Sequence, residues 1–147
     1  MKLAKAFAIA TILAAGTAQA EAERTDPNAI AREELMETVG KNTGILGDMA
    51  KGKTAFDAAQ AEAAKAALVE AAGKIEATFA EPGATDPVSE AKPEIWTNWE
   101  DFLVKAKTLG EAEGAMDVAS AESIGAGMGK LGGACKDCHT TYRVMKE

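Results

Sequence analysis

The stretch that decides the fold is SAESIGAGMGKLGGACKDCHTTY, residues 120–142. Its apolar residues Ile124, Met128 and Leu131 recur at steps of three and four, which is the period of an amphipathic helix. The same spacing is continued by Cys135, Cys138, His139 and Tyr142. We therefore expect a helix from about Ser120 to Met145, with both cysteines and the only histidine on one of its faces.

Three earlier stretches show the same period, and glycines, prolines and turn residues separate them. Asp26 is a good N-cap and Pro27 suits the first helical position, so the first helix is expected to begin there and to end before residues 51–53. Further helices are expected from about Thr54 to Phe79 and from about Glu94 to Gly114, with a loop over 81–93 between them. In the second stretch, Phe56, Leu68, Val69, Ile75 and Phe79 are expected on or near an inner face. The apolar residues of the first and third stretches are Ile30, Leu35, Met36, Val39, Leu46, Met49, Ile95, Trp96, Trp99, Phe102, Leu103, Ala106 and Leu109.

No strand-like alternation competes with these helices, so the predicted fold class is all-α. Each helix has roughly 20 residues and would be about 30 Å long at 1.5 Å per residue. Mostly short connections favour an antiparallel, up-down-up-down four-helix bundle. The chain of 147 residues suits one such domain, here residues 21–147.

The composition excludes several classes of protein. There are 23 Asp and Glu against 16 Lys and Arg, giving a net charge of −7, which argues against a nucleic-acid partner. Two Cys and one His cannot make a disulfide-dense scaffold, and they are too few for a closed zinc site.

The first twenty residues are typical of a secretory signal peptide. Lys2 and Lys5 form a basic start, residues 6–15 are uncharged and apolar, and Ala18-Gln19-Ala20 gives a small-x-small cleavage pattern. The apolar run is well short of the roughly 20 residues that span a bilayer. We expect cleavage after Ala20, no membrane insertion, and a periplasmic location if the source is a Gram-negative bacterium.

Cys135-Lys136-Asp137-Cys138-His139 is the C-x-x-C-H pattern of c-type haem attachment. Each thiol adds across one haem vinyl group, and the adjacent imidazole nitrogen binds the iron from the proximal side. Because residues 135, 138 and 139 share one helical face, a planar ligand can be held by all three. The sequence therefore predicts one covalently bound haem c.

The alternative interpretations of the motif have weaker support. An exported dithiol or disulfide protein with a chance histidine remains a third candidate, but a thioredoxin-like site would need a βαβ pattern, which is absent here. A zinc site would lack its fourth ligand.

The position of the motif, eight residues from the end of the chain, together with several other segments, resembles the class II cytochromes c. That group contains cytochrome c prime and its low-spin relatives, whereas class I cytochromes c carry the motif near the N-terminus. The resemblance covers essentially the whole chain after the signal peptide and implies a four-helix bundle. The matching segments are Arg32–Met36, Lys51-Gly52, Phe56–Ala59, Phe79, Pro82-Gly83, Glu90–Trp96, Gly132–Ala134 and Tyr142-Arg143.

The resemblance also implies roles for individual residues. Cys135 and Cys138 would be the thioether anchors and His139 the proximal ligand. Arg32 and Glu33 match positions that lie against the haem, where Glu33 replaces a common Gln and Arg32 is either a partner of a haem propionate or a solvated surface cation. Glu90 and Ala91 match the loop that packs against the haem edge.

Met36 matches the distal position that faces the iron. Its thioether is either the sixth ligand of a low-spin iron with a raised potential or only a cover over a five-coordinate, high-spin iron. The first arrangement suits an electron carrier that serves redox protein partners and is not an enzyme. The second suits a protein that binds nitric oxide or carbon monoxide as a scavenger or sensor. The family also implies a possible homodimer.

Overall fold

The computed structural model describes residues 25–83 and 86–145. These residues form five helices: α1 (Pro27–Ala50), α2 (Ala58–Phe79), α3 (Glu94–Thr97), α4 (Trp99–Gly114) and α5 (Ala121–Tyr142). The predicted signal peptide and its cleavage site after Ala20 lie outside the described residues. Among the described residues, no helix is both long enough and apolar enough to cross a bilayer.

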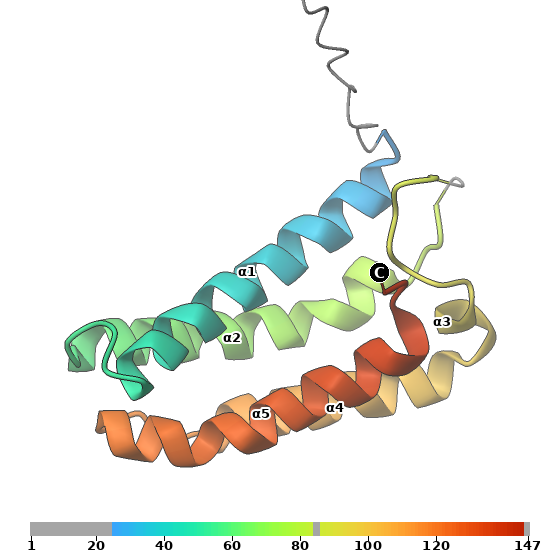
Figure 1. Cartoon of the computed structure of the whole chain (residues 1–147). Helices are drawn as coiled ribbons and strands as arrows, with labels where there is room; N and C mark the ends of the chain where they lie inside the picture. The colour runs from blue at the N-terminus through green and yellow to red at the C-terminus, as the bar shows by residue number, and fades with distance from the viewer. Residues whose placement is uncertain (1–24, 84–85, 146–147) are drawn as a thin grey trace, which may run out of the picture.

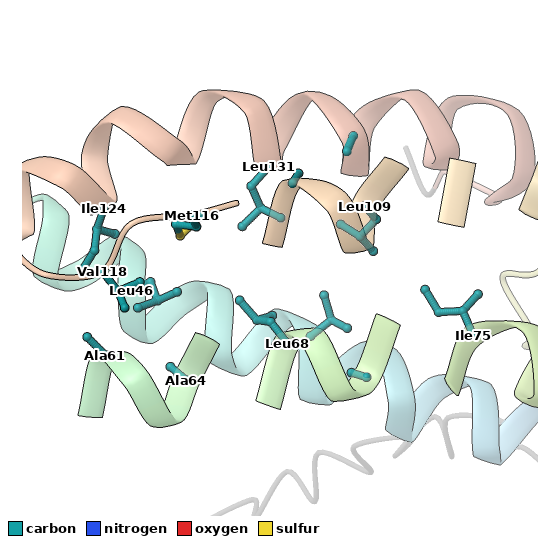
Figure 2. Close-up of a cluster of buried hydrophobic side chains, with 14 of the residues drawn as sticks. Leu46, Ala61, Ala64, Leu68, Ile75, Leu109, Met116, Val118, Ile124 and Leu131 are labelled. Carbon is teal, nitrogen blue, oxygen red and sulfur yellow. The ribbon is translucent and has the colours of Figure 1, made fainter. Parts of the chain in front are cut away.

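The four long helices form an antiparallel bundle, as predicted (Figure 1). Helix α1 packs against α2 and α5, and α4 packs against the same two, so the four enclose a common interior. The short α3 lies at one end, against α4 and α5. Figure 2 shows the interior filled by side chains from all four long helices, among them Leu46, Leu68, Leu109 and Leu131.

Polar side chains cap the starts of three helices, and this explains where they begin. Asp26 Oδ1 accepts the Ala29 N–H at 2.9 Å, and Pro27 occupies the first position as expected. Asp57 caps α2 by accepting the Gln60 N–H at 2.8 Å. Ser120 caps α5, in a reciprocal pair with Ser123.

The cap at Asp57 corrects the predicted start of the second helix, which is Ala58 and not Thr54. Phe56 therefore precedes the helix and is 38% exposed, so its predicted inner position is wrong. Val69 was also expected near the inner face and is 42% exposed, because it follows the buried Leu68 around the helix.

Helix α1 is continuous to Ala50, although its second half contains Gly40, Gly44 and Gly47. Gly40 and Gly44 have open space around them. Gly47 does not, because a Cβ there would lie 3.4 Å from Met128 Cε. The small residue lets α5 pack closely on α1, and this contact supports the end of the helix.

The third and fourth predicted helices differ from the structure at their ends. Asn98, with φ −123° and ψ 44°, separates α3 from α4 where one continuous helix was expected. Helix α5 ends at Tyr142 and not near Met145, because Arg143 is extended. Arg143 instead forms an antiparallel bridge with Ala91 from the 81–93 loop.

Leu68 provides a test of this core, because its neighbour Val69 is a matched control. Leu68 is 0% exposed, so Leu68→Ala should lower the free energy of unfolding by about 2–5 kcal/mol through lost burial and a residual cavity. Val69→Ala removes methyl groups from an exposed position and should change the free energy of unfolding by about 0.5 kcal/mol or less. Urea unfolding followed by circular dichroism measures both; equal losses would contradict the packing described for α2.

Candidate functional site

A cavity of about 540 Å³ lies inside the bundle, at the end where α3 packs. Side chains from all five helices and from residues 89–91 line it. All eight residues singled out from the sequence are among them: Arg32, Glu33 and Met36 from α1, Glu90 and Ala91 from the loop, and Cys135, Cys138 and His139 from α5. The structure thus brings together residues that are more than one hundred positions apart in the chain.

The α5 wall carries the two cysteines as free, half-buried thiols. Burial raises the pKa of Cys138 to about 11. Burial, with a smaller contribution from the charge of Glu113, also raises the pKa of Cys135. Redox-active dithiols have lowered pKa values that favour the thiolate, so these protonated thiols do not suit a disulfide-exchange site.

His139 is half-buried beside them. Burial lowers its pKa, the positive charge of Arg143 lowers it further, and Glu90 opposes the shift. The imidazole is therefore neutral at neutral pH, which is the form that binds a metal. Within 25–83 and 86–145, no three His, Cys, Asp or Glu side chains converge to hold a metal ion by themselves, which disfavours the zinc alternative.

Arg32 is buried in the α1 wall, with 5% of its surface exposed, so its interpretation as a solvated surface cation is wrong. Nη1 and Nη2 donate to the carbonyl oxygens of Glu81 and Pro82 at 3.0 and 3.1 Å. The guanidinium also lies 5.2 Å from the centre of the Trp96 ring. Burial lowers the pKa of Arg32, and the charges of Asp26 and Asp86 partly offset that effect.

Of the three guanidinium nitrogens of Arg32, Nε is the one without a hydrogen-bond partner among the described residues. Nη1 and Nη2 bind the carbonyl oxygens of the turn at residues 81–83. That turn depends on Gly83, whose φ is +74°. A Cβ at Gly83 would collide with the Asp26 carboxylate, so a glycine is required there.

The loop segment that carries Glu90 and Ala91 is attached to the end of α5. Lys92 N–H donates to the Tyr142 carbonyl at 3.0 Å, and Val144 N–H donates to the Glu90 carbonyl at 2.7 Å. The Arg143 guanidinium also pairs with the Glu90 carboxylate at 2.6 Å. This attachment holds the loop over the cavity, next to His139.

Tyr142 is a site residue to which sequence reasoning gave no role. It is buried, lines the cavity and donates its hydroxyl to Asp101 Oδ2 at 2.6 Å, which links α5 to α4. Burial and this hydrogen bond raise the pKa of Tyr142 to about 12. Its place one turn after Cys138 on the predicted helix was the available signal.

One aromatic ring from α2, Phe79, and one from α4, Phe102, line the cavity. Phe102 is central, with its ring centre 5.2 Å from that of Phe79 and 5.4 Å from that of Tyr142. Trp96 and Trp99 pack against the core, as predicted, and Trp96 Nε1 donates to the Phe79 carbonyl at 2.8 Å. Rings at these separations attract one another and stiffen the wall.

The residues present fit a haem. The volume lies in the range of small-molecule and cofactor sites, about 300–1,000 Å³. The lining is largely apolar, with charged side chains from α1, α4 and the loop. Two thiols and a neutral imidazole share the α5 face, and the buried Nε of Arg32 is an unused donor that suits an anionic group.

Arg32 provides a test of the α1 wall. Arg32→Ala removes two hydrogen bonds and the ring contacts, and should lower the free energy of unfolding by about 1–3 kcal/mol. Lys41→Ala, at another α1 position, is the control and should have little effect. Urea unfolding of both variants measures this; an unchanged Arg32→Ala protein would show that the buried guanidinium does not stabilise the turn at 81–83.

Comparison with known proteins adds an independent finding. A family model described as Cytochrome C' matches residues 28–143. A protein named cytochrome c-556 from Agrobacterium tumefaciens (strain apple 185) is 38% identical over 120 residues, which cover 80% of this chain and 94% of that one.

Two solved structures are also similar. The structure titled cytochrome c' from Rhodobacter Spheriodes has a TM-score of 0.74 and 31% identity, and covers 81% of this chain and 96% of its own. The nitric oxide complex of a mutant cytochrome c prime from Alcaligenes xylosoxidans has a TM-score of 0.69 and 25% identity, and covers 80% and 94%.

These findings agree with the motif and with the cavity. Cytochromes of this kind bind haem c covalently, and the C-x-x-C-H residues line a cavity that fits it. The cofactor is therefore haem c, and the chain belongs to the cytochrome c′ family.

Proposed function

We propose that this chain is an exported electron carrier with one haem, held by thioethers at Cys135 and Cys138 and by His139 as the proximal ligand. The observation that carries the proposal is that Met36 of α1 lines the same cavity as these three α5 residues. A thioether from one helix and an imidazole from another are the ligand pair of low-spin electron-transfer cytochromes.

The haem supplies a one-electron Fe(III)/Fe(II) couple, and the chain's own residues set its properties. His139, neutral because it is buried, offers a nitrogen lone pair to the iron. The Met36 sulfur, a soft donor, favours the ferrous state and so raises the potential. No substrate is bound in such a role, so we do not assign an enzymatic activity.

The remaining predicted residues have supporting roles in this proposal. Arg32 Nε is the donor left for a haem propionate, since its other two nitrogens already bind carbonyl oxygens. Glu33 of α1 and Glu90 and Ala91 of the loop line the cavity and would lie at the edge of a bound haem. The attachment of that loop to the end of α5 supports this placement.

A second candidate function is the binding of nitric oxide or carbon monoxide at a five-coordinate iron. The similarity to a protein solved as its nitric oxide complex favours it. Met36 is half-buried and packs against the core, so it has the support needed to cover a distal site without binding the metal.

Export and partners follow from the sequence and the charge. The basic start, the apolar run and Ala18-Gln19-Ala20 support cleavage after Ala20 and a periplasmic location. Cleavage removes Lys2 and Lys5 and changes the net charge from −7 to −9, which favours basic redox proteins as partners through long-range attraction. A homodimer remains part of the proposal on family grounds.

The spectrum of the reduced protein tests the choice between the two functions. We expect sharp α and β bands, because Met36 makes the iron six-coordinate and low-spin. Met36→Ala and Met36→Leu should both convert this spectrum to a broad high-spin one, since both remove the sulfur while leucine keeps the bulk.

A high-spin spectrum in the unmodified protein would contradict the electron-carrier proposal. In that case Met36→Leu should leave the spectrum unchanged, and Met36→Ala should admit carbon monoxide faster. A low-spin spectrum that survives both substitutions would show that another group is the sixth ligand.

A further inference from the structure

Glu113, in the last turn of α4, is a buried carboxyl group with no role in the site described above. Its exposed fraction is 0%, and neither carboxylate oxygen has a hydrogen-bond partner within the described ranges. Leu109 and Met116, on either side of it in the sequence, both belong to the hydrophobic core (Figure 2). A charged carboxylate in such a place is costly, so a specific function is the natural explanation.

Two features of this position favour the neutral acid. Burial raises the pKa of Glu113 to about 7. The position near the C-terminus of α4 acts in the same direction, because the helix dipole there disfavours negative charge. The proton on Glu113 is therefore exchanged near neutral pH, where small changes in the local field alter its occupancy.

Glu113 is also next to the cavity wall. Leu109, one helical turn earlier on the same face of α4, lines the cavity, and so does Cys135 of the adjacent α5. The charge of Glu113 acts on the Cys135 thiol and contributes to its raised pKa. By the same Coulomb interaction, a change of charge on a group held at Cys135 would act on Glu113.

Among the residues that the structure describes, the charged side chains of α4 near Glu113 have other partners. Burial raises the pKa of Glu113, and no ion pair joins its carboxyl group to another residue that the structure describes. On α4 itself, Lys107 pairs with the exposed Glu111, and Lys105 pairs with Asp137. From α5, the Cys135 thiol interacts with Glu113, and it no longer titrates once it has formed a thioether to the haem.

We propose that Glu113 binds a proton when the haem gains an electron, so that the protein transfers a proton together with its electron. The inference rests on the proposed one-electron function. One electron from a reduced redox protein converts Fe(III) to Fe(II), and the Glu113 carboxylate takes one proton from solvent; oxidation reverses both steps. Because linkage is reciprocal, protonation of Glu113 must raise the reduction potential.

The test is a potentiometric titration of the haem-loaded protein at a series of pH values on both sides of neutral. The midpoint potential should fall as the pH rises through the neutral range and level off on each side. Glu113→Gln, which mimics the neutral acid, should abolish this fall and keep the potential at the low-pH level. Glu111→Gln, the same change at an exposed position two residues away, should retain the fall.

A measurement without substitution gives a second readout. The reduced-minus-oxidised infrared difference spectrum near neutral pH should contain a positive carbonyl band of a protonated carboxyl group, lost in Glu113→Gln and kept in Glu111→Gln. A midpoint potential that does not change with pH in the unmodified protein, or a fall that persists in Glu113→Gln, would overturn the proposal. A high-spin reduced spectrum would instead overturn the electron-carrier function. Failure of the Glu113 proposal and failure of the electron-carrier proposal therefore give different results.

Discussion

Helical geometry at one segment is the constraint on which the rest of the structure depends. Cys135, Cys138 and His139 lie on one face of α5 because their spacing matches the helical period, and that face borders the cavity. The bundle then supplies the opposing walls: α1 with Met36, and the aromatic side of α2 and α4. A planar group attached to α5 would contact every helix, so attachment and burial are achieved by the same side chains.

Two buried ionisable side chains, Arg32 and Glu113, behave differently because their surroundings differ. Arg32 is buried but keeps its charge through two carbonyl oxygens and the nearby Asp26 and Asp86. Glu113 is buried with no such partner among the described residues, and its pKa rises to about 7. One group therefore stays charged as part of the structure, while the other titrates near neutral pH. The difference lies in the hydrogen-bond partners that each side chain meets.

Much of this arrangement could be predicted from local sequence. Short segments contain the N-cap Asp26 with Pro27 after it, the apolar period around Leu68, and the C-x-x-C-H motif. The structure confirms the helices that these features predict. The break at Asn98 and the early end of α5 depend on contacts with distant residues, which periodicity does not contain. Burial of Glu113 was missed because charged residues on an amphipathic pattern are expected to be exposed. For Arg32, only the resemblance implied a position against the haem, and a solvated surface position remained the alternative.

The central claim is that α5 carries a haem bound through two thioether bonds, and the intact mass of the native protein tests it most directly. The protein should be expressed with the c-type maturation machinery, exported, purified and denatured before the measurement, so that any group bound without a covalent bond is lost. The account predicts the mass of the polypeptide from Glu21 to Glu147 plus one haem. The mass of the bare polypeptide would contradict it.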